Sequence, residues 1–163
     1  MCLMAADCMQ TLGMSGDQFS VNINNRKILD AILAQVGIDA QANDYDIRRL
    51  TILRALDKLD RLGIGGVADL LGDGRKDESG DYTKGAGLDK TSIAKLTDFV
   101  QAGRDTRSET LKALAEIIGD SKIGVAGLEE LTLMDALMHD NGDSICFNPS
   151  VVRGLGYYTG PVF

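Results

Sequence analysis

The sequence predicts an α+β fold in which strand-forming segments at the two ends of the chain flank a helical middle. Residues 18–24 alternate strictly between polar and apolar side chains, with Phe19, Val21 and Ile23 on one face, which is typical of a half-buried strand. The middle of the chain repeats its apolar residues at helical spacing, and residues 144–147 are again strand-forming. Because two strands alone are only marginally stable, we expect the two ends to pair with each other or with further chain.

The length and composition exclude several classes of protein. With 163 residues the chain is long enough for one domain with a buried core, or for a domain and a fragment of another. Apolar residues make up 44% and charged residues 25%, which argues against disorder, and no apolar run approaches the roughly 20 residues of a membrane span. The N-terminus lacks a basic region and a cleavage-site pattern, so we expect a cytoplasmic protein with no membrane association.

Charge, cysteine and histidine content narrow the possible ligands. The formal charge of −7 means that any contact with nucleic acid has to come from a local basic patch. The three cysteines, Cys2, Cys8 and Cys146, are odd in number and irregularly spaced, which favours free thiols over disulfides. With His139 as the only histidine and no Cys-x-x-Cys pair, no metal site is predicted, and His139 is interpreted as a capping or surface residue.

Four helices are predicted in the first half of the chain. The first covers residues 2–12, and the second follows Asn24 or Asn25 as its N-cap. A longer helix over residues 44–62 comes next, with a short helix at 64–71 after it. A solvated face and a contact with RNA are equally good interpretations of the basic side of the longer helix. That side carries Arg48, Arg49, Arg54, Lys58 and Arg61.

Residues 72–87 form a polar, glycine-rich segment that is too long for a simple connector. Its acidic residues do not have the spacing of a calcium-binding loop, and it lacks the Gly-Lys-Ser/Thr of a phosphate-binding loop. The segment includes Arg75 and Lys76, and a mobile or RNA-facing loop is predicted. Three further helices are predicted at about 90–102, from the capping box Thr106–Glu109 onward, and at about 124–140.

The C-terminal stretch has the most unusual residue pattern. Arg153 lies in an apolar, glycine-containing context, where a permanent planar charge suits a phosphate or a carboxylate. Gly154 and Gly156 would let a substrate or another backbone approach closely. A regular strand would place the adjacent Tyr157 and Tyr158 on opposite faces, and from the residues alone a purely structural strand is the preferred interpretation. Because the chain stops inside an apparent strand, we expect it to be a piece of a larger protein.

Three segments carry a family resemblance. Residues 153–160, Arg-Gly-Leu-Gly-Tyr-Tyr-Thr-Gly, resemble the Arg-Gly-Leu-Asp/Glu-Tyr-Tyr signature peptide of histidyl-tRNA synthetases. Residues 19–30 are similar to that family's strand-to-helix segment, Asn-Asn/Asp-Arg-Arg/Lys-Ile/Leu-Leu-Asp. Residues 56–62 resemble part of the insertion of its eukaryote-like and α-proteobacterial branch. The segments occur in the family's order, and the resemblance covers nearly the whole chain.

The resemblance implies a predominantly helical insertion domain over residues 39–142. Strands of the antiparallel sheet of a class II catalytic domain would bracket it, within residues 1–38 and 143–163. The parent enzyme, expected to be a homodimer, would activate L-histidine with Mg-bound ATP and transfer the amino acid to tRNA(His).

The resemblance also implies roles for individual residues. Arg153 matches the catalytic arginine that contacts the carboxylate of histidine and the α-phosphate, where it would stabilise developing charge. Tyr157 and Tyr158 match tyrosines of the histidine pocket, with Tyr158 expected at the imidazole. The insertion would approach the acceptor end of the RNA, which makes seven basic residues candidate tRNA contacts: Arg48, Arg49, Arg54, Lys58, Arg61, Arg75 and Lys76.

Two departures from the family pattern bear on function. Gly156 stands where the family has an acidic residue, which puts the fine tuning of the histidine pocket in doubt. The three class II motifs and the anticodon-binding domain are absent, so the chain alone is expected to be inactive and to retain no cofactor. Two alternatives stay open: a synthetase-like regulatory subunit of ATP phosphoribosyltransferase, which Gly156 favours, and an independent helical RNA-binding module.

Overall fold

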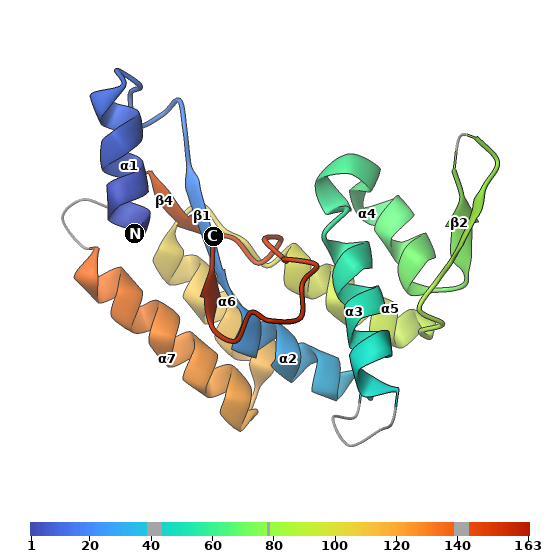
Figure 1. Cartoon of the computed structure of the whole chain (residues 1–163). Helices are drawn as coiled ribbons and strands as arrows, with labels where there is room; N and C mark the ends of the chain where they lie inside the picture. Colours follow the sequence, from blue (N-terminus) through green and yellow to red (C-terminus); the bar gives the residue numbers. More distant parts are fainter. Residues whose placement is uncertain (39–43, 78, 139–143) are drawn as a thin grey trace.

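The computed structural model describes residues 1–38, 44–77, 79–138 and 144–163, and it has the predicted α+β architecture. Figure 1 shows α1, a small sheet, α2, α6 and α7 beside a part that contains α3, α4 and a β-hairpin. The elements in chain order are α1 (Cys2–Thr11), β1 (Val21–Asn25), α2 (Arg26–Gln35), α3 (Tyr45–Leu56), α4 (Leu59–Leu71), β2 (Gly74–Lys76), β3 (Tyr82–Lys84), α5 (Lys90–Val100), α6 (Arg107–Ile118), α7 (Lys122–Leu137), β4 (Ile145–Phe147) and β5 (Pro161–Val162).

β1 is the central strand of a three-stranded sheet with the order β4-β1-β5. It pairs with β4 in parallel, with Val21 opposite Ile145. It pairs with β5 in the antiparallel direction, with Asn24 opposite Val162. The two ends of the chain therefore pair with each other across the helices, as predicted. The sheet is mixed over the described residues, whereas the family resemblance implied antiparallel strands.

The core is built around the contact of α2 with α7. The two helices approach closely because α7 has glycines where it meets α2: a Cβ on Gly127 would lie 2.9 Å from Ile28 Cγ1, and one on Gly124 would lie 3.0 Å from the Cβ of Ala31. The buried cluster continues into α3, α5, α6 and β4. Because this cluster joins residues of the predicted insertion with residues of its flanks, the division at residues 38 and 142 stays a prediction.

The prediction of one helix over residues 44–62 is wrong. α3 ends at Leu56, a short turn follows, and α4 runs on to Leu71 through the predicted short helix. The turn lets α4 fold back on α3, so that the apolar residues of both helices enter the same core. Within α4, Gly63 has φ 65° and ψ 177°, a kink that glycine adopts at little cost.

The segment predicted as a loop at residues 72–87 contains an antiparallel hairpin of β2 and β3, with Arg75 opposite Thr83. The backbones of its two arms approach closely at glycines. A Cβ on Gly85 would collide with the carbonyl oxygen of Gly72. The strands are too short to show a period in the sequence, which is why the loop prediction failed here.

The C-terminal stretch is also not the regular strand that was predicted. β5 covers only Pro161–Val162, and the residues between β4 and β5 form a loop. As a result Tyr157 and Tyr158 do not point to opposite faces: their ring centroids lie 4.7 Å apart with a tilt of 34°. Glycine-rich sequence permits this path, and the side chain of Arg26, described below, holds it.

The N-cap half of the capping box predicted at the start of α6 is present. The Thr106 hydroxyl accepts the Glu109 N–H at 3.2 Å and donates to the Glu109 carboxylate at 2.8 Å. We expect Thr106→Ala to lower the free energy of unfolding by about 1 kcal/mol, because the Glu109 N–H loses its partner. Urea unfolding would measure the loss. Thr132→Ala, which removes an exposed hydroxyl within α7, should change stability less; equal losses would contradict the prediction.

Candidate substrate site in the loop between β4 and β5

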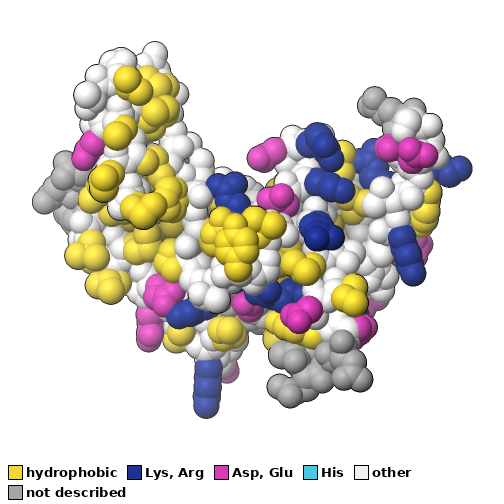
Figure 2. Space-filling model, viewed as in Figure 1, with side chains coloured by type: hydrophobic (Ala, Val, Ile, Leu, Met, Phe, Trp, Pro, Cys, Tyr) yellow, Lys and Arg dark blue, Asp and Glu magenta, His cyan; other side chains and the backbone are white. Residues whose placement is uncertain are grey.

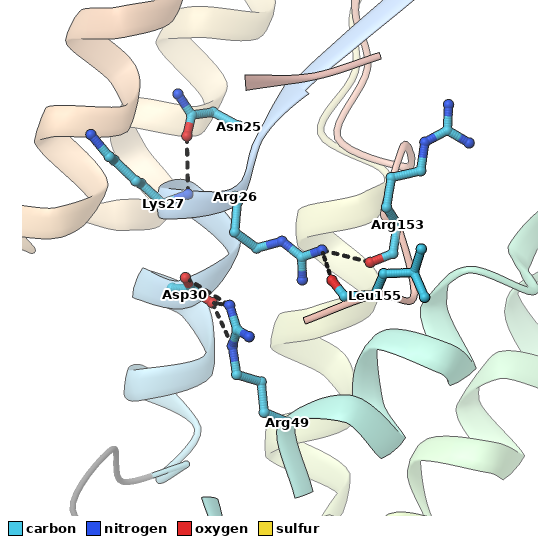
Figure 3. Close-up of polar contacts among 7 residues, drawn as sticks. All are labelled: Asn25, Arg26, Lys27, Asp30, Arg49, Arg153 and Leu155. Carbon is cyan, nitrogen blue, oxygen red and sulfur yellow. Dashed lines mark hydrogen bonds and ion pairs between the residues drawn. The ribbon is translucent and has the colours of Figure 1, made fainter. Parts of the chain in front are cut away.

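The loop between β4 and β5 lies between the small sheet and α3 (Figure 1). Its Arg153 side chain is exposed, and Nη2 donates to the carbonyl oxygen of Phe163 at 2.7 Å. In Figure 3 this guanidinium points away from Arg26 and α2. The loop therefore presents a permanent positive charge on its outer side.

Arg26, the first residue of α2, holds this loop from the inner side. Its side chain is almost completely buried, with 2% of the residue exposed. Nη2 donates to the carbonyl oxygens of Arg153 at 2.6 Å and Leu155 at 3.0 Å (Figure 3). The Arg26 backbone N–H also donates to the Gly160 carbonyl at 2.9 Å. Burial lowers the pKa of Arg26 below its ordinary value, the charge of Arg49 lowers it further, and Asp30 opposes both effects.

The two asparagines before Arg26 extend these contacts. The Asn24 amide donates to the carbonyl oxygens of Pro149 at 3.0 Å and Val151 at 3.2 Å. The side-chain oxygen Oδ1 of Asn25 caps α2 by accepting the Lys27 N–H, and the side-chain amide nitrogen of Asn25 donates to Glu130 of α7. Sequence reasoning placed these residues in the strand-to-helix segment but did not identify their contacts with the loop. A run of amides and one arginine directly after a buried strand was the available signal.

Tyr157 and Tyr158 form a tilted pair at the outer turn of the loop. Tyr157 is 71% exposed, and Tyr158 is half-buried. The hydrogen bond with Tyr158 raises the pKa of Tyr157 above its ordinary value. Two adjacent phenols on one side of the loop can offer both stacking surface and hydrogen bonds to a planar polar group.

A cavity of about 720 Å³ lies beside the loop. Arg153 lines one side of it, Asp57 and Asp60 another, and the first turns of α1 a third. Of the predicted histidine-site residues, Arg153 lines this cavity, whereas Tyr157 and Tyr158 are not among its lining residues. The structure therefore brings Arg153 to a cavity and places the tyrosine pair a short way along the same loop.

The end of α3 forms a wall against the loop. A Cβ on Gly154 would lie 3.3 Å from Asp57 Oδ2, and a Cβ on Gly156 would lie 3.5 Å from Leu50 Cδ2. A carboxylate at position 156, where the resembled family has one, would extend towards this leucine methyl group. Gly156 therefore fits the apolar neighbour that this chain provides.

The seven residues predicted to contact tRNA lie at different places on the structure. Lys58, Arg61 and Arg75 line one groove of about 590 Å³ between α4 and the hairpin. Arg54 and Lys58, with Lys84, line a smaller neighbouring groove, and Lys84 was missed from the sequence. Arg48 and Lys76 lie outside both grooves. Figure 2 shows Lys and Arg side chains gathered over α3 and α4, whereas hydrophobic side chains gather over α1.

Arg49 does not belong with this basic surface. The residue is 9% exposed, and its guanidinium pairs in bidentate fashion with Asp30 of α2, with N–O distances of 2.9 to 3.1 Å (Figure 3). The prediction that it lies on an RNA-facing side of the helix is corrected: the arginine joins α3 to α2 through a largely buried ion pair.

The described residues show no group of three or more His, Cys, Asp or Glu side chains placed to hold a metal ion. Cys2, Cys8 and Cys146 are free thiols, as predicted. His139 lies outside the described residues. Among the described helices none is long and apolar enough to cross a bilayer.

Comparison with known proteins finds relatives that match nearly the whole chain. No family model matches the chain. The chain is 46% identical over 165 residues to a histidine–tRNA ligase of Jannaschia sp. (strain CCS1), covering 99% of the chain and 32% of the ligase. The ligase of Bartonella henselae is 48% identical over 99% of the chain and 33% of its own length. The chain is homologous to part of a histidine–tRNA ligase.

The chain spans about a third of the length of the curated histidine–tRNA ligases that it matches. A crystal structure of histidyl-tRNA synthetase from Nostoc sp. PCC 7120 has the same fold over 88% of the chain and 30% of the synthetase, with a TM-score of 0.65 and 22% identity. The resemblance of the Arg153 loop to a ligase signature is thus part of a relationship that extends over the whole chain.

Glu130 joins α7 to the start of α2. Lys27 pairs with it and Asn25 donates to it at 2.7 Å, and these interactions lower the pKa of Glu130 below its ordinary value. The lowered pKa stabilises the fold above the pKa of the unfolded chain, and this stabilisation is lost as the pH falls through the folded pKa.

We therefore expect Glu130→Gln to be less stable than the wild type at pH 7, and the difference to shrink as the pH falls below about 5. Urea midpoints at pH 7, 5 and 3 would measure this dependence. Glu116→Gln, on the exposed side of α6, is the control. A difference that stays constant or grows on acidification would contradict the assignment.

Proposed function

We propose that the chain is the segment of a histidine–tRNA ligase that carries part of the histidine site together with the helical insertion at residues 39–142. The parent protein activates L-histidine with Mg-bound ATP and transfers it to tRNA(His). The observation that carries the proposal is the exposed Arg153 guanidinium, which lines a cavity on a backbone held by buried donors. Similarity to histidine–tRNA ligases over the whole chain supports it.

The chemistry assigned to Arg153 follows from its charge and position. Its guanidinium contacts the carboxylate of histidine and the α-phosphate, and it stabilises the negative charge that develops as the carboxylate attacks phosphorus. Tyr157 and Tyr158 receive the imidazole on the same loop, with Tyr158 the closer contact because it is the more buried of the pair. Apart from this contact with the α-phosphate, ATP is held by parts of the parent protein beyond this chain.

Histidine-dependent pyrophosphate exchange tests the proposal. The parent reading frame, expressed in full, should show exchange and should charge tRNA(His), whereas the 163-residue chain alone should show neither. Pyrophosphate exchange by the chain alone would contradict the proposal that ATP is held mainly by other parts of the parent protein. Histidine binding by the parent without exchange would instead favour the synthetase-like regulatory subunit.

The basic groove between α4 and the hairpin is proposed to contact the acceptor end of tRNA. Substituting Lys58, Arg61 and Arg75 together by glutamine should weaken tRNA binding and reduce the slope of log K against log salt by about 2 to 3, because up to three phosphate contacts are lost. Filter binding at several salt concentrations would measure the slope. Lys112→Gln, on α6, is the control, and an unchanged slope in the triple variant would exclude the groove.

A further inference from the structure

We propose that Arg26, assisted by Asn24, is the positioning residue of the Arg153 loop: its buried guanidinium sets the direction in which Arg153 meets the substrate. The inference rests on the proposed function and adds to it a residue that does not itself touch histidine or ATP. Three further observations support it: a frame of carbonyl contacts, the high cost of burying this guanidinium, and the single hydrogen bond that the Arg153 side chain makes within the described part of the chain.

The first observation is the geometry of the frame. Asn24 and Arg26 come at the end of β1 and the start of α2, where the backbone is fixed by pairing with β5 and by the cap of α2. From this base they bind carbonyl oxygens spaced along the loop. The acceptors are Pro149 and Val151 for the Asn24 amide, Arg153 and Leu155 for the Arg26 guanidinium, and Gly160 for the Arg26 N–H. The loop is therefore held at its start, middle and end.

The second observation is that burying the Arg26 guanidinium costs folding free energy, so stability alone does not explain its position. Within the described residues, Nη1 of Arg26 is buried and has no hydrogen-bond partner. The carboxylate of Asp30, which lies nearby, makes its hydrogen bonds to Arg49 instead (Figure 3). Burying a charged group away from water costs free energy, and leaving one of its nitrogens without a hydrogen-bond partner adds to that cost. The contribution of this guanidinium is thus the position of the two carbonyl groups it binds.

The third observation concerns Arg153 itself. Its side chain is exposed, and the structure records one hydrogen bond from it, to the Phe163 carbonyl. The direction of the side chain depends on its backbone, which Arg26 holds at Arg153 and again at Leu155. Misplacing a catalytic group by about 1 Å can cost about 100-fold in rate, so an error in this backbone would reach the chemistry. The tyrosine pair follows on the same held loop.

Hydrogen exchange of the 163-residue chain tests the positioning. We expect Arg26→Met to speed the exchange of the loop amides that donate hydrogen bonds, those of Val151 and Val152, by about 10-fold or more, while the amides of α2 and α7 keep their wild-type rates. Arg26→Lys should speed the same amides less, because one ammonium cannot hold both carbonyls as well. Arg104→Met is the matched control, since Arg104 Nη1 also donates to two carbonyls, those of Gln101 and Gly103, neither of which belongs to the loop.

Kinetics of the parent ligase test the consequence. Arg26→Met should lower kcat for pyrophosphate exchange by about 100-fold and change KM for ATP by less than about threefold, because the variant misplaces Arg153 without removing a contact to the nucleotide. Arg104→Met should retain wild-type kinetics. Unchanged loop amides, equally faster exchange in α2 and α7, or a wild-type kcat for Arg26→Met would each overturn the inference. A wild-type parent without exchange activity would refute the proposed function, and the amide rates would still decide the positioning.

Discussion

Replacing Arg153 by methionine should lower the histidine-dependent pyrophosphate exchange of the parent ligase by about 100- to 1,000-fold, the range found when a charge-stabilising donor is removed from an active site. The guanidinium is exposed and its recorded bond goes to one backbone carbonyl, so its loss should leave the fold intact. The loss should appear in kcat and in kcat/KM together, because the interaction is strongest when charge has developed on the reacting groups.

Two comparisons sharpen this experiment. Arg153→Lys keeps the charge but loses the planar two-point contact, so it should recover only part of the rate. Urea unfolding of the 163-residue chain should give the same midpoint for Arg153→Met and the wild type. A methionine variant with at least a tenth of the wild-type kcat would contradict the assignment of Arg153 as catalytic.

The second large effect is expected at Asp30. This carboxylate pairs with Arg49, with side-chain exposures of 19% and 11%, and it lies next to Arg26. Asp30→Asn would leave the buried guanidinium of Arg49 without its partner and would remove a favourable negative charge beside Arg26. We expect a loss of about 3 kcal/mol or more in the free energy of unfolding, the usual result of removing one member of a buried pair. Urea unfolding of the chain would measure it.

A double-mutant cycle separates the ion pair from the packing of its side chains. The double variant Asp30→Asn/Arg49→Met should regain at least half of the stability lost in Asp30→Asn, because the unpaired charge of Arg49 is gone and its stem is replaced by an apolar one. If the two single losses simply add in the double variant, the ion pair does not join α3 to α2 energetically.

The helices could be predicted from the sequence because their signals are local. The apolar residues of α2 lie within a few residues of its asparagine cap, and the residues that cap α6 are equally close to that helix. Each group determines the local structure without distant residues. Pairing of the two ends of the chain was one of two predicted outcomes, the other being pairing with further chain, because short strands need partners.

The structural features that were predicted wrongly are determined by residues that are distant in the sequence. The alternation after Arg153 suggests a strand, but Arg26, 127 residues earlier in the chain, binds its carbonyl and holds a loop. The sequence places Arg49 on a basic face of its helix, but in the structure Asp30 of another helix binds it in an ion pair. The same holds for the candidate site. Arg153 was singled out from its immediate neighbours in the sequence, whereas the contacts of Asn24 and Arg26 with its loop were not predicted.

The pairing of β1 with both β4 and β5 determines when this site forms during synthesis. Asn24 and its acceptor at Pro149 are 125 residues apart, and ribosomes add about 5 to 20 residues per second, so β1 waits roughly 6 to 25 s for its partners. Helices form in microseconds from local contacts and do not have to wait. We expect most of the helical middle to be folded before the loop closes, with both edges of β1 unpaired until then and open to association with other chains. A nascent chain stalled before residue 145 should therefore depend most strongly on chaperones, and it should lose that dependence once β5 has emerged.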